Sequence, residues 1–383
     1  MSNNNGDPGS RGWAYRWFGW LLIGGIVLAC FAAWHRSESI SDELAVQRAI
    51  AAAPKPVRGA FTAAEVNRLA LKITPSLVDV ETEIGNLGIG GAGSGIVVSA
   101  SGEILTNNHV INQATAVEVV TKGNQKRYPA KVVGYDRNHD VALLQIQGPA
   151  KLYPAAIGDS TAVRIGEPIL GIGNAGGAGG KPVRAPGKVN NLGRSISTSD
   201  ELTGSTEQLK GLIEILADIR PGDSGGPLVN EAGQVIGVNT AASVNYKTSV
   251  PSGTGYAIPI NDAMQIVQVI RSGRSTDEVH VGPTGIIGIA VTGPALRPDG
   301  YVSPGVNPGA TVTAVGYGSP GEAAGLKRGD TIVGVDGTPI DSPTRLTAIT
   351  GRHRPGDRLN VEWVTQTGQR RTGAIVLDEG PPA

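Results

Sequence analysis

Short apolar runs separated by glycine-rich or polar turns dominate the chain between residues 76 and 259. Runs of this kind at regular spacing are typical of β-barrels or β-sandwiches rather than of alternating strands and helices. We therefore expect a mainly β region with these strands: Leu77–Thr82, Gly95–Ser99, Val117–Val120, Lys131–Tyr135, Val141–Ile146, Pro168–Gly171, Ile213–Leu216, Pro227–Val229 and Val235–Asn239.

Apolar residues at helical spacing flank this β-rich region. One helix is expected within residues 62–75, where a proline ends the pattern, and a second over Asn261–Arg271. Residues from about 284 to 378 are again β-rich, with a short helix near 342–350. Asp336-Gly337 lies between two apolar runs and predicts a tight hairpin.

The N-terminal residues 17–34 contain no charged side chain and have a tryptophan at each end. As a helix they would span about 27 Å, close to the thickness of a hydrocarbon core. Tryptophans suit the two membrane interfaces, and the preceding Arg11 and Arg16 favour a cytoplasmic N-terminus. We expect a single-pass anchor with the rest of the chain outside the cytoplasm.

Two alternatives to an anchor remain for this segment. Val27-Leu-Ala-Cys30 resembles a bacterial lipoprotein cleavage box, in which Cys30 would be acylated. A cleaved signal peptide fits less well, because no small-residue cleavage site precedes a polar stretch. Anchor and lipoprotein alike would leave the protein tethered outside the membrane.

Composition and charge narrow the class of partner. Lysine plus arginine equals aspartate plus glutamate, 33 each, which argues against a nucleic acid as the main partner. Glycine occurs 56 times and phenylalanine three times, which suits a loop-rich β protein. A single cysteine, Cys30, rules out an internal disulfide bond.

The stretch Arg220–Pro227 carries the candidate nucleophile, Ser224, in a glycine-rich turn. A serine hydroxyl attacks at neutral pH only if a base takes its proton and donors stabilise the resulting oxyanion. Glycine permits the tight backbone that aims N–H groups at one point. We expect an oxyanion hole at Gly222, Asp223 and Ser224, with the N–H groups of the first and last converging.

A base and its orienting carboxylate are present upstream, in the chain order His, Asp, Ser that one of the known triad arrangements has. His109 follows an apolar run, and Asp140 stands at the head of the next strand. His109 would take the proton of Ser224 and return it to the leaving amine, while Asp140 would hold the imidazole. His139 is the nearest competing histidine, but strand alternation points it to the opposite face. Ligand spacing for a metal is absent, so no metal or cofactor is expected.

Two stretches near the nucleophile are predicted to be mobile loops, Asn174–Gly187 and Asn190–Gly211, because they have little apolar content. The run Gly171–Gly176 matches a dinucleotide fingerprint formally. The glycines that follow it cannot start the helix on which a pyrophosphate would bind, so this reading is rejected. We expect the loops to gate activity, with the oxyanion turn formed fully after ligand binding or oligomerisation.

About four fifths of the chain, residues 62–378, resembles the HtrA/Deg family of trypsin-like serine proteases with a C-terminal PDZ domain. The resemblance implies a chymotrypsin-like double β-barrel followed by a PDZ domain. It also implies a homo-oligomer, commonly a trimer, and cleavage of misfolded or regulatory proteins outside the cytoplasm. The motifs that carry it are Gly93–Val98, Leu105–Val110, His139–Leu144, Gly222–Pro227, Val238–Ala241, Gly255–Pro259, Ile286–Ile289 and Gly325–Asp330.

The resemblance also implies a domain organisation and further site residues. The backbone of Ile286, Ile287, Gly288 and Ile289 would bind a peptide C-terminus, with a covered, autoinhibitory groove as the alternative. Specificity-pocket residues would be Asp218, Asn239, Thr240 and Ala241. The expected parts are a cytoplasmic N-terminus (1–16), a transmembrane helix (17–34), a linker (35–60), the protease domain (61–271), a second linker (272–283) and the PDZ domain (284–379).

The sequence departs from the family at the specificity pocket. Many relatives have an aspartate at the position of Leu216, whereas here Asp218 lies six residues before Ser224, as in trypsin. Asp218 would then select arginine or lysine at the cleaved bond, unless it forms an ion pair with Arg220. Two other functions remain open: a chaperone or scaffold that binds unfolded chains without cleaving them, and an esterase, since the triad does not distinguish esters from amides.

Overall fold

The computed structural model describes residues 61–85, 89–177, 179–200, 206–240, 246–247, 253–293 and 308–382. The predicted membrane segment 17–34, including Cys30, and the predicted linker 35–60 lie outside these residues. Within the described ranges, no helix is both long enough and apolar enough to cross a membrane.

The described chain begins with the predicted helix, α2 (Ala63–Ile73). A capping box starts it: the Glu65 N–H donates to the Thr62 hydroxyl, and the Thr62 N–H donates to the Glu65 carboxylate. Leu69, Ala70 and Ile73 are buried on one face, so the 3.6-residue pattern identified the helix correctly. A single 3₁₀ turn, η1 (Thr74–Ser76), leads into the first strand.

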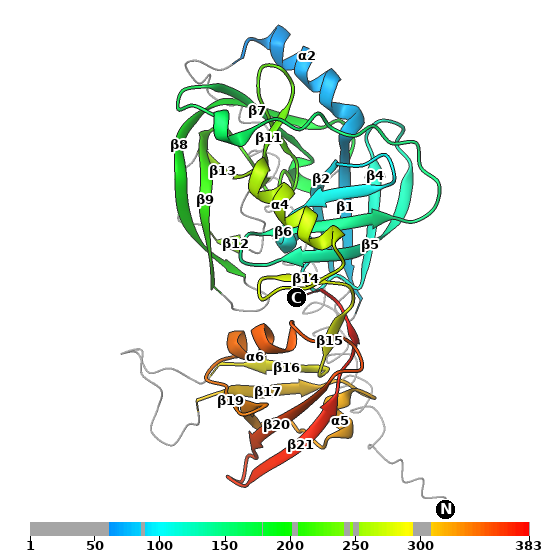
Figure 1. The fold of residues 1–383 in the computed structure, drawn as a ribbon, viewed down its shortest axis with the longest axis vertical. Coiled ribbons are helices and arrows are strands. Elements are labelled where there is room, and N and C mark those ends of the chain that lie inside the picture. The colour runs from blue at the N-terminus through cyan, green and yellow to red at the C-terminus, as the bar shows by residue number, and fades with distance from the viewer. Residues whose placement is uncertain are drawn as a thin grey trace, which may run out of the picture. The chain divides into compact units, whose positions relative to one another are not determined.

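Six strands form the first β-barrel. Their order is β5-β4-β1-β2-β3-β6, and β6 pairs again with β5, which closes the sheet. Closure leaves no free edge among these six strands. The interior is filled by aliphatic side chains such as Val78, Ile104 and Leu144. The bounds are β1 (Leu77–Ile84), β2 (Ile89–Val97), β3 (Glu103–Thr106), β4 (Ala116–Thr121), β5 (Arg127–Asp136) and β6 (Val141–Ile146), drawn blue to blue-green in Figure 1.

The second barrel closes in the same way, because β8 pairs with both β7 and β9 at the two ends of the order β8-β7-β10-β11-β13-β9. A short strand, β12 (Tyr246–Lys247), is added outside β8. The other bounds are β7 (Pro168–Gly173), β8 (Val183–Asp200), β9 (Thr206–Leu216), β10 (Pro227–Val229), β11 (Val235–Thr240) and β13 (Thr254–Pro259), green in Figure 1.

The long β8–β9 hairpin differs from the sequence-based expectation. Most of the stretch predicted as a loop, Asn190–Gly211, forms paired strands. The pairing shifts register at three places between Val189 and Ile196. Each shift interrupts the alternation of buried and exposed side chains, and that alternation is the signal by which a strand is recognised in a sequence.

Helix α4 (Ile260–Arg271) follows the second barrel, as predicted, and its Arg271 makes a bidentate ion pair with Glu103 on β3. The predicted linker 272–283 is partly structured: β14 (Val279–Val281) pairs with β5. His280, within the predicted linker, lies in this strand and is 5% exposed, with its ring stacked on Tyr135 at a centroid distance of 5.2 Å.

The C-terminal unit contains a sheet of order β16-β17-β18-β20-β21, with β19 paired to β18, around its own apolar core. Asp336 and Gly337 have φ values of 47° and 76°, which confirms the predicted hairpin turn. Its elements are β15 (Thr284–Ile286), β16 (Ile289–Thr292), β17 (Ala310–Val315), α5 (Pro320–Ala323), β18 (Thr331–Val335), β19 (Thr338–Pro339), α6 (Pro343–Thr350), β20 (Arg358–Val364), β21 (Arg370–Val376) and β22 (Asp378–Gly380).

Helix α2 offers a matched test of its buried face. Leu69 is 0% exposed, whereas Leu71 on the same helix is 74% exposed. Leu69→Ala is expected to lower the free energy of unfolding by about 2–5 kcal/mol, because it leaves a cavity. Leu71→Ala should change it by less than about 0.5 kcal/mol. Urea denaturation followed by circular dichroism measures both, and equal effects of the two substitutions would contradict the packing described for α2.

Candidate active site

His109 and Asp140 are brought together by the loops at one end of the first barrel. His109 lies on the short helix α3 (Asn108–Ile111), directly after β3, and Asp140 ends the turn between β5 and β6. The His109 Nδ1 atom is 2.9 Å from Asp140 Oδ2 and 3.0 Å from Oδ1. The His109 backbone N–H also donates to Asp140 Oδ1 at 2.9 Å. The carboxylate therefore fixes both the backbone and the ring of this histidine.

Asp140 is itself fixed from two sides. Thr240, at the end of β11 in the second barrel, donates its hydroxyl to Asp140 Oδ2 at 2.9 Å. The Asn107 side-chain amide donates to the Asp140 carbonyl at 2.8 Å. Asp140 is 3% exposed and has a φ of 55°, a conformation uncommon for residues other than glycine. A buried carboxylate beside Nδ1 favours the tautomer with its proton on Nδ1, which leaves Nε2 as a proton acceptor.

Ser224 lies in the turn between β9 and β10 and lines the same cleft as His109. The cleft has a volume of about 1400 Å³, and Pro221, Gly222 and Gly176 also line it. The Ser94 N–H donates to the Ser224 carbonyl at 2.7 Å, which holds this turn against β2 of the first barrel. The fold thus places a histidine and a serine on one cleft, with the carboxylate of Asp140 buried against the histidine ring.

Gly222 has a conformation that other residues cannot adopt without strain. Its φ is 95°, and a Cβ atom there would lie 2.2 Å from the Asn174 carbonyl oxygen. The Pro221 carbonyl accepts a hydrogen bond from the Gly176 N–H at 2.7 Å. In a trans peptide the N–H points opposite to the carbonyl, so the Gly222 N–H points away from Gly176.

The three expected oxyanion residues differ in what their N–H groups do. The Asp223 N–H donates to the Arg220 carbonyl at 2.9 Å, so it is occupied within the turn. The Asp223 carboxylate in turn accepts from the Arg220 N–H at 3.0 Å. Among the residues that the structure describes, the Gly222 N–H donates to no protein acceptor. Asp223 therefore closes the turn from which the Gly222 N–H projects.

Two residues that hold this turn, Ser94 and Asn174, were not identified as such from the sequence. The Ser94 hydroxyl donates to the Gly222 carbonyl at 2.8 Å and accepts from the Asn174 N–H at 2.9 Å. Both residues are buried. The glycines on either side of Ser94 were the available signal: a Cβ atom at Gly93 would come within 3.2 Å of the Ser224 carbonyl, so the backbones approach closely there.

The expected specificity residues have separate hydrogen-bond partners. Asp218 forms an ion pair with Arg220, with 2.9 Å between Nε and Oδ2. The Asn239 side-chain amide donates to the Pro227 carbonyl at 3.2 Å, and Thr240 bonds Asp140 as described above. Ala241 lies outside the described residues. The side chain of Ile219 occupies the space beside Gly171 and Gly255, within 2.4 Å and 2.7 Å of where their Cβ atoms would be.

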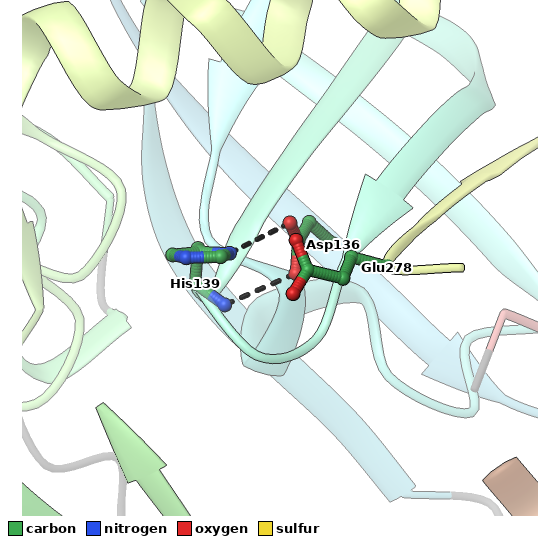
Figure 2. A group of neighbouring side chains, drawn as sticks. All are labelled: Asp136, His139 and Glu278. Atoms are coloured by element: carbon green, nitrogen blue, oxygen red, sulfur yellow. Dashed lines mark hydrogen bonds and ion pairs between the residues drawn. The ribbon is translucent and has the colours of Figure 1, made fainter. Parts of the chain in front are cut away.

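His139 has a different partner from His109, and it lies in the turn before β6 rather than in a strand. Figure 2 shows it beside Asp136, whose carboxylate accepts from the His139 N–H at 3.1 Å and lies 2.8 Å from Nδ1. The hydrogen bond to Asp136 raises the pKa of His139. Glu278, far away in sequence, brings a third ligand atom within 4.8 Å of these two, a grouping that sequence spacing could not reveal. Because Asp136 and His139 already bond each other, we assign these two residues to closing the turn before Asp140.

The expected carboxylate-binding loop lies at the free edge of the C-terminal sheet. In the described residues β16 pairs only with β17, so its other edge is open. Ile286 ends β15, Ile287 is buried in the core, and Ile289 begins β16. Gly288 has a φ of 75°, and its carbonyl accepts from the Gly316 N–H at 2.9 Å. The open edge and this loop are the features by which a peptide is added to a sheet.

Comparison with known proteins matches both parts of the chain. Residues 93–238 match the family of the trypsin-like peptidase domain, and residues 285–372 match the PDZ domain. The serine protease PepD of Mycobacterium tuberculosis is 32% identical over 343 residues, which cover 86% of this chain and 69% of that protein. The putative serine protease HhoA of Synechocystis is 35% identical, covering 75% and 70% respectively.

The periplasmic pH-dependent serine endoprotease DegQ of Escherichia coli is 37% identical over 289 residues, which cover 75% of this chain but 59% of DegQ. A solved structure of the HtrA-type protease AlgW with a decapeptide is 26% identical and covers 83% of this chain and 99% of that one, with a TM-score of 0.46. The sequence relatives and the two matched domains show that this chain belongs to the HtrA/Deg family of trypsin-like serine endopeptidases that carry a PDZ domain.

Proposed function

We propose that Ser224, His109 and Asp140 form the catalytic triad of an HtrA-type endopeptidase that cleaves misfolded or regulatory proteins outside the cytoplasm. The observation that carries this proposal is the 2.9 Å contact between His109 Nδ1 and Asp140 in the cleft that Ser224 lines. Three residues in this order and geometry have no joint use in a protein that only binds its partners.

The reaction follows from the proton positions. His109 Nε2 takes the proton of Ser224 Oγ as this oxygen attacks the peptide carbonyl carbon. Asp140 stabilises the imidazolium that forms, and its own position depends on Thr240. The carbon–nitrogen bond then breaks, His109 returns the proton to the leaving amine, and water hydrolyses the acyl-enzyme by the same route.

The developing oxyanion would be stabilised by the N–H groups of Gly222 and Ser224. Donors fixed in place before the reaction are the largest single contribution in this class of mechanism. Asp223 supports them by closing the turn, rather than by donating its own N–H. At the specificity pocket, the Arg220 ion pair weakens the case for Asp218 as a selector of basic residues, since the carboxylate already has a cation. Identifying the cut sites in a denatured protein would test this, and cuts mainly after arginine or lysine would contradict it.

Replacing the nucleophile tests the enzyme against the chaperone alternative. Ser224→Ala is expected to lower kcat on a casein-like substrate by more than about 10⁴-fold, because no other group can form the acyl-enzyme. Ser101→Ala, at an exposed turn, is the control and should retain full activity. Undiminished proteolysis by the Ser224 variant would refute the proposed triad. Unchanged function of this variant in cells would favour the chaperone.

We further propose that the PDZ domain binds peptide C-termini at residues 286–289. A peptide with a free carboxylate should bind at least about tenfold more tightly than its amidated form, since hydrogen bonds to a charged group are the stronger ones. Gly288→Ala should abolish this difference: a Cβ atom there would lie 2.4 Å from Ser319. Gly318→Ala also has a positive φ but open space, and serves as control. Equal binding of both peptides by the wild type would contradict carboxylate capture.

The proposal includes tethering through residues 17–34 and assembly into a homo-oligomer, with a trimer expected from the family. The tethering rests on the 18 uncharged residues between flanking arginines. In cells, Cys30→Ser should leave the protein in the membrane fraction after alkaline carbonate extraction, whereas deletion of residues 17–34 should release it. Release by the Cys30 substitution alone would show that the protein is a lipoprotein instead. Sedimentation of the detergent-solubilised protein would test the oligomer.

A further inference from the structure

A lysine and an aspartate form a buried ion pair at the wall of the cleft, which Asp79 lines. Lys122, directly after β4, donates to Asp79 on β1, and their side chains are 1% and 2% exposed. Burial raises the pKa of Asp79, while Lys122 opposes this effect. Taking two charges out of water costs about as much free energy as their attraction returns, so a buried pair is weak evidence for a role in stability. A role other than stability would have to come from the other contacts that Lys122 makes.

Lys122 has a second acceptor, the carbonyl oxygen of Gly180, at 2.8 Å. Gly180 belongs to the glycine-rich segment 174–180, of which residue 178 is not described. Glycines 176, 177, 179 and 180 all have positive φ values. Glycine allows many backbone conformations, so a segment of this composition is ordered only by hydrogen bonds to its main chain. Lys122 supplies one of these bonds from outside the segment.

The same segment holds the turn that carries the nucleophile. Asn174 accepts from the Gly177 N–H with its carbonyl, at 2.8 Å, and from the Gly179 N–H with its side chain, at 2.9 Å. These bonds place the Gly176 N–H on the Pro221 carbonyl at 2.7 Å. That contact fixes the direction of the Gly222 N–H. If it is lost, the peptide between Pro221 and Gly222 is free to rotate, since glycine offers little resistance.

We propose that Lys122, held by Asp79, is a positioning residue for the oxyanion turn. Through the Gly180 carbonyl it keeps the glycine-rich segment against Pro221, so that the Gly222 N–H stays directed as the transition state requires. This inference rests on the proposed catalytic role of Gly222 and Ser224. It assigns to a buried charge pair, which acts through the Gly180 carbonyl, control over the fraction of enzyme molecules whose oxyanion turn is competent.

The test removes the pair without leaving one charge buried alone. Asp79→Asn combined with Lys122→Met is compared with Lys122→Met alone and with Lys126→Met, an exposed lysine of the same turn. In the full-length protein, kcat of the double variant on a peptide ester or amide is expected to fall about 10- to 100-fold. This loss is smaller than that caused by removing an oxyanion donor outright, because the donor is misdirected in only part of the molecules. KM should change by less than about threefold, because ground-state binding is not affected. Lys126→Met should behave as wild type.

Two further readouts separate positioning from a general loss of structure. Affinity for a peptide boronate, which forms a tetrahedral anionic adduct with the serine, should fall in parallel with kcat, as expected of a transition-state analogue. Gly222→Ala shows how large the loss of kcat and of boronate affinity is when the turn is misdirected. Gly193→Ala is its control, because Gly193 also has a positive φ but a Cβ atom there would meet no neighbour. A double variant with unchanged kcat and boronate affinity would overturn the proposal, as would a loss confined to KM.

Amide hydrogen exchange of the wild-type protein supplies evidence even if neither variant folds. The Gly176 N–H should be protected as well as the neighbouring strand β7, because its bond to Pro221 is part of the ordered site. Exchange at the rate of an unstructured loop would overturn the proposal. A wrong catalytic assignment would give a different result. Ser224→Ala would then retain activity, and substitutions of Asp79 and Lys122 would not change that activity.

Discussion

The two halves of the active site are joined at the nucleophile by a backbone hydrogen bond: the Ser94 N–H donates to the Ser224 carbonyl at 2.7 Å. His109 and Asp140 come from the first barrel and Ser224 from the second, and each barrel is closed on itself. Closed barrels share no strand, but one apolar cluster contains side chains of both, such as Leu105 and Leu170. Hydrogen bonds of this kind add to that packing and fix the two barrels at the cleft itself. The Ser94 hydroxyl adds a second one, to Gly222, and Thr240 returns one from the second barrel to Asp140. The chemistry therefore depends on backbone groups that a list of catalytic side chains omits.

Glycine is the residue that makes these close contacts possible. At Gly93, Gly173 and Gly226 a Cβ atom would lie within 3.3 Å of atoms of Ser94, Asp223 or Ser224. The high glycine content therefore has two origins in this molecule. Some glycines let backbones meet at the cleft, and others, in the segment 174–180, leave a chain that needs external hydrogen bonds to become ordered.

The parts that could be predicted from the sequence are those in which a local pattern matches a local structure. Helix α2, the Asp336–Gly337 turn and strands such as Val141–Ile146 follow from apolar spacing and turn chemistry. The β8–β9 hairpin could not be identified, because its register shifts break the alternation. The partners of Ser94 and Lys122 could not be identified either: they are 128 and 58 residues away in the sequence, so the contacts are made only by the fold. The ion pair of Asp218 with Arg220 was foreseen as an alternative to a role in the specificity pocket.

Strand β14 changes how far the PDZ domain can reach from the protease. A free linker over residues 272–283 could extend about 40 Å. Because Val279–Val281 pairs with β5, only residues 282 and 283 remain between the last paired residue and the start of β15, a reach of about 10 Å. A short tether confines whatever the PDZ domain holds to a small volume around the protease. Capture at the PDZ domain therefore raises the effective concentration of the captured chain near the cleft.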